Sequence, residues 1–171
     1  MKKPVLYLFV GYPGAGKTTA AQLIQEKSGA VHLWADRERI KLFHEPTHSR
    51  EESLQLYDQL NEAAEYLLAQ GKSVIYDTNF NFYKDRQHLR MLATQHNADA
   101  VVIWLTTPRA LSKQRAVEKS HGEATRLFGN MSATDFERIA GNLQPPTKYE
   151  KVIKIDGTNL DTQELLRQLG L

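Results

Sequence analysis

Residues 5–19 read VLYLFVGYPGAGKTT, an apolar run joined directly to a glycine-rich loop. No polar residue breaks the run Val5–Val10, which predicts a strand buried on both faces of a sheet. The next residues, Gly11 to Thr18, match G-x-x-x-x-G-K-[ST], the pattern of a phosphate-binding loop. Thr18 to Lys27 then reads as a helix that ends before Gly29. Strand, loop and helix in this order predict an anion site within an α/β fold.

The chemistry of this loop suits a nucleoside triphosphate. Backbone N–H groups of the loop converge on phosphates, and the helix dipole favours negative charge at the same point. Lys17 would reach the β- and γ-phosphates, and the Thr18 hydroxyl would coordinate Mg²⁺. We therefore expect ATP to bind with Mg²⁺ as cofactor. The loop residues expected to contact ATP are Gly11, Pro13, Gly14, Ala15, Gly16, Lys17, Thr18 and Thr19.

Composition limits the alternatives. A chain of 171 residues suits one domain, residues 1–171, and no apolar run is long enough to span a membrane. The absence of cysteine fits a cytoplasmic protein, and a net charge of +2 gives no argument for nucleic acid. His44 and His48 are separated by Pro46, and the other histidines show no ligand spacing, so no zinc site is predicted. Nothing in the sequence indicates an obligate protein partner.

Apolar and helical segments alternate along the whole chain. Five short apolar runs separated by helices predict a parallel sheet covered by helices on both faces. The expected strands are 5–10, 30–34, 73–76, 100–105 and 151–155, and the expected helices are 18–27, 37–43, 52–70, 83–96, 109–128, 133–142 and 160–169. Ligands of such sheets bind beyond the carboxyl ends of the strands, so residues at those ends are the candidates for chemistry.

Two acids follow predicted strands. Asp77 closes the run Val74-Ile75-Tyr76, a pattern typical of a carboxylate that supports Mg²⁺, although a helix cap or a turn would also use it. Asp36 follows the second strand and is a candidate general base for an acceptor hydroxyl. The alternative for Asp36 is an N-cap of the helix beginning at Arg37, and the two roles are compatible.

Basic residues supply the remaining candidates. Arg39 could bind an acceptor phosphate, hold a carboxylate, or be a solvated helix charge. The basic stretch 109–128 could form a helical lid that brings Arg115 and Arg126 to the transferring phosphoryl group, or it could be a solvated surface helix. The turn Asp156–Asn159 is a candidate for contact with the base.

These motifs together resemble the predicted-kinase family of P-loop proteins related to the kinase domain of bacteriophage polynucleotide kinase and to the zeta-toxin and small-molecule kinases. The resemblance is carried by the glycine-rich loop, by Asp36 with Arg39 three residues later, and by Val74–Asn79 with its Asp-Thr-Asn ending. It implies a three-layer α/β/α fold with strand order 2-3-1-4-5 and a helical lid. It also implies that Asp36 is the general base, that Arg39 lies in the acceptor site, and that the lid arginines, with Arg115 and Arg126 as candidates, contact the ATP phosphates. Asp77 and Asn79 are further candidates for acceptor binding. The sequence departs from the phage enzyme at Arg37, where that enzyme has a second acid, and leaves no room for a phosphatase domain.

The predicted function is transfer of the γ-phosphoryl group of ATP to a hydroxyl group. A small-molecule acceptor is favoured over nucleic acid because the charge is nearly neutral and no dense basic cluster is present. A polynucleotide 5′-hydroxyl kinase is the alternative, with Phe80, Phe82 and Tyr83 either stacking on a base or filling the core. A sensor that binds ATP without turnover is the alternative of another class. A regulatory GTPase is disfavoured because the sequence lacks N-K-x-D and a D-x-x-G after a strand.

Overall fold

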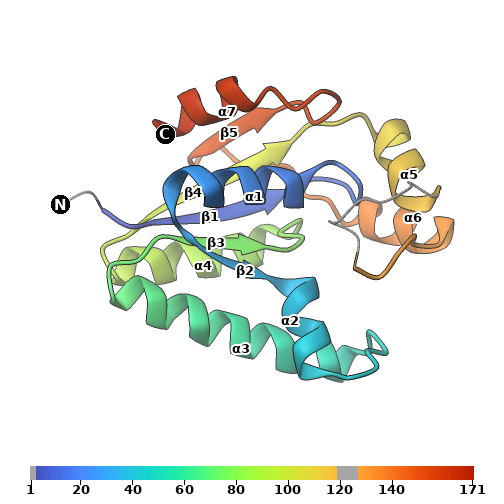
Figure 1. Ribbon diagram of the computed structural model, residues 1–171, viewed down its shortest axis with the longest axis horizontal. Coiled ribbons are helices and arrows are strands. Elements are labelled where there is room, and N and C mark those ends of the chain that lie inside the picture. Colours follow the sequence, from blue (N-terminus) through green and yellow to red (C-terminus); the bar gives the residue numbers. More distant parts are fainter. Residues whose placement is uncertain (1–2, 119–126) are drawn as a thin grey trace.

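The computed structural model describes residues 3–118 and 127–171. Five strands in this part form one parallel sheet in the order β2-β3-β1-β4-β5, which confirms the predicted order (Figure 1). The strands are β1 (Val5–Val10), β2 (Val31–Trp34), β3 (Val74–Asp77), β4 (Asp99–Leu105) and β5 (Val152–Ile155). The helices are α1 (Lys17–Ser28), α2 (Ala35–Leu42), α3 (Arg50–Ala69), α4 (Tyr83–Gln95), α5 (Arg109–Val117), α6 (Ala133–Gly141) and α7 (Thr162–Leu169).

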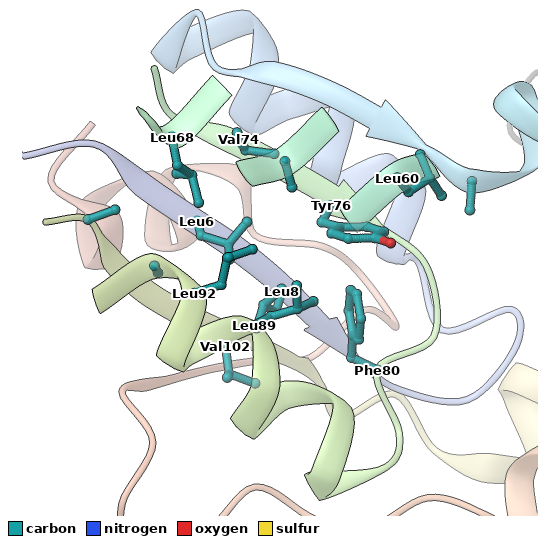
Figure 2. Close-up of a cluster of buried hydrophobic side chains, with 14 of the residues drawn as sticks. Leu6, Leu8, Leu60, Leu68, Val74, Tyr76, Phe80, Leu89, Leu92 and Val102 are labelled. Atoms are coloured by element: carbon teal, nitrogen blue, oxygen red, sulfur yellow. The ribbon is translucent and has the colours of Figure 1, made fainter. Parts of the chain in front are cut away.

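The sheet is the middle of three layers. Side chains of β1 alternate between its two faces, as the pleat of a strand requires, and both faces are buried. Leu6 and Leu8 pack toward α3 and α4 in the cluster that Figure 2 shows with Leu60, Leu89 and neighbouring residues. On the other face, Tyr7 and Phe9 belong to a second cluster with residues of α1 and α7. Burial on two faces is the reason that β1 reads as an unbroken apolar run.

The sheet order places the functional loops together. β1 lies between β3 and β4, and β2 pairs with β3 so that Trp34 lies beside Asp77. The carboxyl ends of β1, β2 and β3 therefore meet at one edge of the sheet. The helices α5 and α6 lie beyond the same edge (Figure 1). None of the helices in the described residues is both long and apolar enough to cross a membrane.

Two of the differences between the predicted and observed helix boundaries bear on the site. The helix expected over 109–128 ends at Val117, and Leu127 and Phe128 lie in a turn. The carbonyl of Ala116 near that end accepts a hydrogen bond from the Met131 N–H (3.0 Å). Residues 119–126, with Arg126, lie outside the described residues.

The second difference concerns α2. This helix begins at Ala35, and its N-cap residue is Trp34. Asp36 therefore lies inside the first turn, and the predicted alternative that Asp36 is the N-cap is wrong. The helix starts earlier because Trp34, the last residue of β2, already has the extended backbone of a cap position (φ −95°, ψ 106°).

Candidate active site

The glycine-rich loop between β1 and α1 is packed tightly by its neighbours. Gly14 has a left-handed backbone (φ 79°), and a Cβ there would overlap the carbonyl oxygen of Ser112 in α5. Gly16 (φ 103°) is the N-cap of α1, so the first amides of that helix face the loop without intrahelical partners. Asn81 fixes the start of the loop, because its Oδ1 accepts from the Gly11 N–H at 3.2 Å. The loop thus has the geometry of an anion cradle.

Lys17 points back over this cradle. Its Nζ donates to the carbonyls of Gly11 (3.0 Å) and Tyr12 (2.7 Å). Burial lowers the pKa of the Lys17 ammonium to about 8, and the charges of Asp77 and Asp36 partly oppose that shift. A half-buried ammonium group whose hydrogen bonds go to neutral carbonyls gains from an incoming phosphate.

Thr18 and Asp77 meet beneath the loop. The Thr18 hydroxyl donates to Asp77 Oδ1 at 3.3 Å. Asp77 is the last residue of β3 and is buried, whereas the N-cap residue of the next helix is Phe82, so the alternative of Asp77 as a helix cap is wrong. These hard oxygen donors suit Mg²⁺, which keeps several waters and takes only one or two protein ligands beside substrate phosphates. The described residues hold no cluster of three or more His, Cys, Asp or Glu side chains that would indicate another metal. Thr18 and Asp77 therefore fit the predicted cofactor.

Asp36 lies close to the same group of charges. Burial raises the pKa of the Asp36 carboxyl, the charge of Asp77 raises it further, and Arg39, His48 and Lys17 oppose the shift. The site thus brings together Asp36, Asp77 and Lys17 from the ends of three neighbouring strands. A carboxyl group with a raised pKa is better matched to proton transfer near neutral pH than an ordinary aspartate.

Arg39 faces inward from α2. It is 6% exposed, so the alternative of a solvated helix charge is wrong. Its Nη2 donates to Ser53 Oγ (3.2 Å), and its Nη1 lies 3.5 Å from Glu52 Oε2. Within the described residues, Nη1 has no hydrogen-bond acceptor. A buried guanidinium nitrogen that is ion-paired but lacks a hydrogen-bond acceptor is suited to an anionic or polar group of a ligand.

The region after β3 divides its residues between site and core. Asn79 Oδ1 is buried and has no hydrogen-bond donor among the described residues. Phe80 is a core residue, since its ring packs edge-on against Tyr76 at 4.8 Å (Figure 2). Phe82, in contrast, is 44% exposed. Tyr83 begins α4, and its ring lies 5.8 Å from the Arg86 guanidinium. The aromatic set predicted after β3 therefore does not form one stacking surface.

The structure places Arg115 next to the loop, and the turn after β5 holds its guanidinium. Its Nη1 and Nη2 each donate at 2.8 Å, to the carbonyls of Gly157 and Thr158. The turn that contains these carbonyls lies against the loop, because a Cβ at Gly157 would overlap the carbonyl oxygen of Ala15. The turn predicted to contact the base is thus beside the cradle, whereas Arg126 lies outside the described residues.

Three residues of the site were missed by sequence reasoning. His32 Nε2 lies 3.0 Å from Asp77 Oδ2, Asn81 holds Gly11, and Arg37 stacks its guanidinium over the Trp34 ring at 4.8 Å. A signal for His32 existed, because a histidine within a buried strand needs a polar partner. The partners of Asn81 and Arg37 depend on loop geometry, and no spacing in the sequence indicates them.

Fold and site together define a P-loop nucleotide-binding protein with the architecture of P-loop kinases. Residues 6–146 match the family described as AAA domain, and the chain belongs to that family. No curated protein sequence is significantly similar to the chain.

Solved structures share this fold at low identity. A candidate kinase from Chloroflexus aurantiacus has a TM-score of 0.77 and 20% identity, with 99% of this chain and 96% of that chain covered. APS kinase CysC of Mycobacterium tuberculosis, in complex with AMPPNP and APS, has a TM-score of 0.67 and 17% identity, with 100% of both chains covered. A chain of the Pnkp1/Rnl/Hen1 RNA repair complex has a TM-score of 0.67 and 20% identity, with 84% of this chain and 45% of that chain covered. The predicted resemblance to P-loop kinases is confirmed at the level of family and fold.

Proposed function

We propose that the protein is a kinase that transfers the γ-phosphoryl group of ATP to a hydroxyl group of a small-molecule acceptor, with Mg²⁺ as cofactor. The observation that carries this proposal is the convergence of Lys17, the Thr18–Asp77 pair and Asp36 at one edge of the sheet. Binding of the phosphates and their metal ion requires only Lys17 and the Thr18–Asp77 pair. The additional group, the half-buried Asp36 carboxyl with its raised pKa, is the proton acceptor that an acceptor hydroxyl needs.

Each residue has a defined part in this reaction. Lys17 exchanges its two loop carbonyls for the β- and γ-phosphates. Thr18 and Asp77 would hold Mg²⁺, which would supply positive charge beside the phosphate oxygens. Asp36 accepts the proton of the acceptor hydroxyl while the hydroxyl oxygen bonds to the γ-phosphorus. The bond from that phosphorus to the bridging oxygen breaks, and ADP leaves with the electron pair.

Acceptor binding falls to the residues around Asp36. Arg39 offers Nη1, which has no hydrogen-bond acceptor in the described residues, and Asn79 offers its buried Oδ1. Arg115 would bind ATP indirectly, by holding the turn 156–159 against the loop. The near-neutral charge of the chain favours a small acceptor over a long polynucleotide, whose backbone would need a track of basic residues. APS kinase, a structural neighbour, was solved with the small molecule APS, which is in keeping with this preference.

The test is transfer of radiolabelled γ-phosphate to a panel of acceptors: sugars, nucleosides, aminoglycosides and 5′-hydroxyl oligonucleotides. Phosphorylation of a small hydroxyl compound in the presence of Mg²⁺ supports the proposal. Phosphorylation of the oligonucleotides alone would replace it with a polynucleotide 5′-hydroxyl kinase. ATP binding without transfer to any member of the panel would favour a non-catalytic ATP-binding regulator.

A further inference from the structure

Both oxygen atoms of Asp77 are held, each by a different element. Oδ1 accepts from Thr18 at the start of α1 (3.3 Å), and Oδ2 lies 3.0 Å from Nε2 of His32 in β2. An ionised carboxylate can only accept, so Nε2 of His32 is the donor. The bond to His32 is the shorter of the two.

The His32 ring is itself fixed on several sides. Its side chain is 4% exposed, and the ring stacks parallel to Trp34 with centroids 5.9 Å apart and planes 7° apart. Its second nitrogen, Nδ1, lies 3.3 Å from the side-chain amide of Gln25 in α1, which can present its N–H to Nδ1 when Nε2 is the donor. Because the His32 ring is held by these contacts, it can fix the orientation of the Asp77 carboxylate.

We propose that His32 is a positioning residue for the metal site: it holds Oδ2 of Asp77 and leaves Oδ1 as the oxygen available to Mg²⁺. The inference rests on the Mg²⁺·ATP site of the proposed function. Magnesium requires near-ideal octahedral geometry with short bonds, so it is sensitive to how a carboxylate is turned. When the Thr18 hydroxyl binds the metal, His32 is the side chain in the described part of the chain that still holds Asp77.

The test compares Mg²⁺-dependent and Mg²⁺-independent binding of a fluorescent ATP analogue. For His32→Ala, affinity in EDTA should equal that of the wild type, while half-saturation by Mg²⁺ should rise by about 10–100-fold, the usual cost of losing a partner of a metal ligand. His32→Gln places an amide N–H where Nε2 stood and should restore most of the response, whereas the shorter His32→Asn should not. The matched control is His96→Ala, because His96 also pairs with a carboxylate, Glu65 (3.2 Å), but lies on the far end of α4.

Replacing Mg²⁺ by Ca²⁺ separates positioning from general support of the fold. A carboxylate released from His32 can bind through both oxygens, which suits Ca²⁺ and not Mg²⁺. The preference for Mg²⁺ over Ca²⁺ should therefore fall in His32→Ala and recover in His32→Gln. If His32→Ala does not fold, the comparison of His32→Gln with His32→Asn gives the same answer.

A wild-type Mg²⁺ response in His32→Ala, or equal losses in EDTA, Mg²⁺ and Ca²⁺, would overturn the positioning role. It would also be overturned if nucleotide binding by the wild type ignored Mg²⁺. Failure of the kinase proposal looks different, because it is seen as an absence of transfer to any acceptor while Mg²⁺-dependent binding persists.

Discussion

At the scale of single residues, two half-buried groups of opposite charge define the site. Burial raises the pKa of the Asp36 carboxyl and lowers that of the Lys17 ammonium to about 8. Both shifts have desolvation as their largest cause, so each group is held closer to its neutral form than it would be in water. Bound phosphates would stabilise the charged form of Lys17. An acceptor hydroxyl would transfer its proton to the Asp36 carboxylate.

Asp36→Asn should separate binding from transfer. The amide keeps the size of the side chain but cannot accept a proton, so transfer should fall by about 10²–10⁴-fold while the Kd for ATP stays unchanged. Single-turnover kinetics and equilibrium binding measure the two effects. Asp58→Asn, at an exposed position of α3, is the matched control. Wild-type transfer rates in Asp36→Asn would remove Asp36 from the mechanism.

The same carboxyl links stability to pH. Because the folded-state pKa of Asp36 is raised, its contribution to stability is complete below the unfolded pKa and is lost as the pH rises through the folded pKa. Asp36→Asn should therefore raise Tm at pH 8 and have little effect near pH 3, where the carboxyl is neutral in both states. Thermal unfolding at a series of pH values measures this difference. A lower Tm of Asp36→Asn at pH 8 would contradict a raised pKa of the Asp36 carboxyl in the folded protein.

Deprotonation of Lys17 should make ATP affinity fall at alkaline pH. Its ammonium has a pKa of about 8, so proton linkage predicts ATP binding about tenfold weaker at pH 9 than at pH 7. Lys17→Ala should abolish binding at both pH values, whereas Lys27→Ala, at the exposed end of α1, should behave like the wild type. Isothermal titration calorimetry at the two pH values provides the comparison. An affinity independent of pH would mean that the ammonium stays charged throughout.

At the scale of elements, the glycine-rich loop is enclosed by α5 and by the turn after β5. Thr107 Oγ1 donates to the carbonyl of Ala15 at 2.7 Å, and Arg115 ties α5 to the turn 156–159. The loop therefore contacts three separate parts of the chain: the segment from Thr107 into α5, the turn after β5, and Asn81 after β3. These contacts constrain the loop conformation, since the loop sequence itself is rich in glycine.

Gly157→Ala tests this packing. The new methyl group would overlap the carbonyl of Ala15 and the Thr107 hydroxyl, so the turn must move away from the loop. Overpacking of this kind costs about 1–3 kcal/mol, and ATP affinity should fall with it. Gly141→Ala is the matched control, because a Cβ there meets no atom of the described chain within 4 Å. Urea unfolding measures the stability of both variants, and ATP titration measures their affinity. Equal stability and affinity in the two variants would show that the turn is free to shift.

At the scale of the whole molecule, one buried ion pair joins segments that are distant in sequence. Arg86 Nε donates to Glu150 Oε1 at 2.7 Å, and both side chains are 0% exposed. Arg86 also donates to the carbonyls of Phe80 (2.8 Å) and Pro145 (3.4 Å). The pair thereby links α4 and the segment after β3 to the chain that leads into β5. Asn81, which holds the glycine-rich loop, lies in the linked segment.

Breaking this pair should destabilise the whole fold. Glu150→Gln leaves the Arg86 charge buried without its partner, which typically costs about 3–5 kcal/mol in the free energy of unfolding. The exposed pair Arg138–Asp135 gives the control, since Arg138→Gln should change stability by about 0–1 kcal/mol. Chemical denaturation of the two variants measures the contrast. Similar losses in both would show that the buried pair adds nothing beyond a surface pair.

Much of the fold could be predicted because its signals are local. The apolar run of β1, the glycine-rich loop and the acids Asp36 and Asp77 at strand ends follow from periodicity and short motifs. Sheet topology then brings the strand ends to one edge, so a site assembled from them was also predictable. Helix ends were less predictable: α2 starts before Asp36, and α5 stops at Val117 where the Ala116 carbonyl bonds to Met131.

The sequence by itself determined the parallel sheet, the cradle and the identity of the charged residues beside it. Only the tertiary structure decided which partners these residues have: His32 with Asp77, 45 residues apart, Asn81 with Gly11, and Arg86 with Glu150. The physical reason is that a motif fixes the conformation of a few adjacent residues, whereas a hydrogen bond between side chains needs both atoms placed within tenths of an ångström. That placement comes from the packing of whole elements, which no local pattern records.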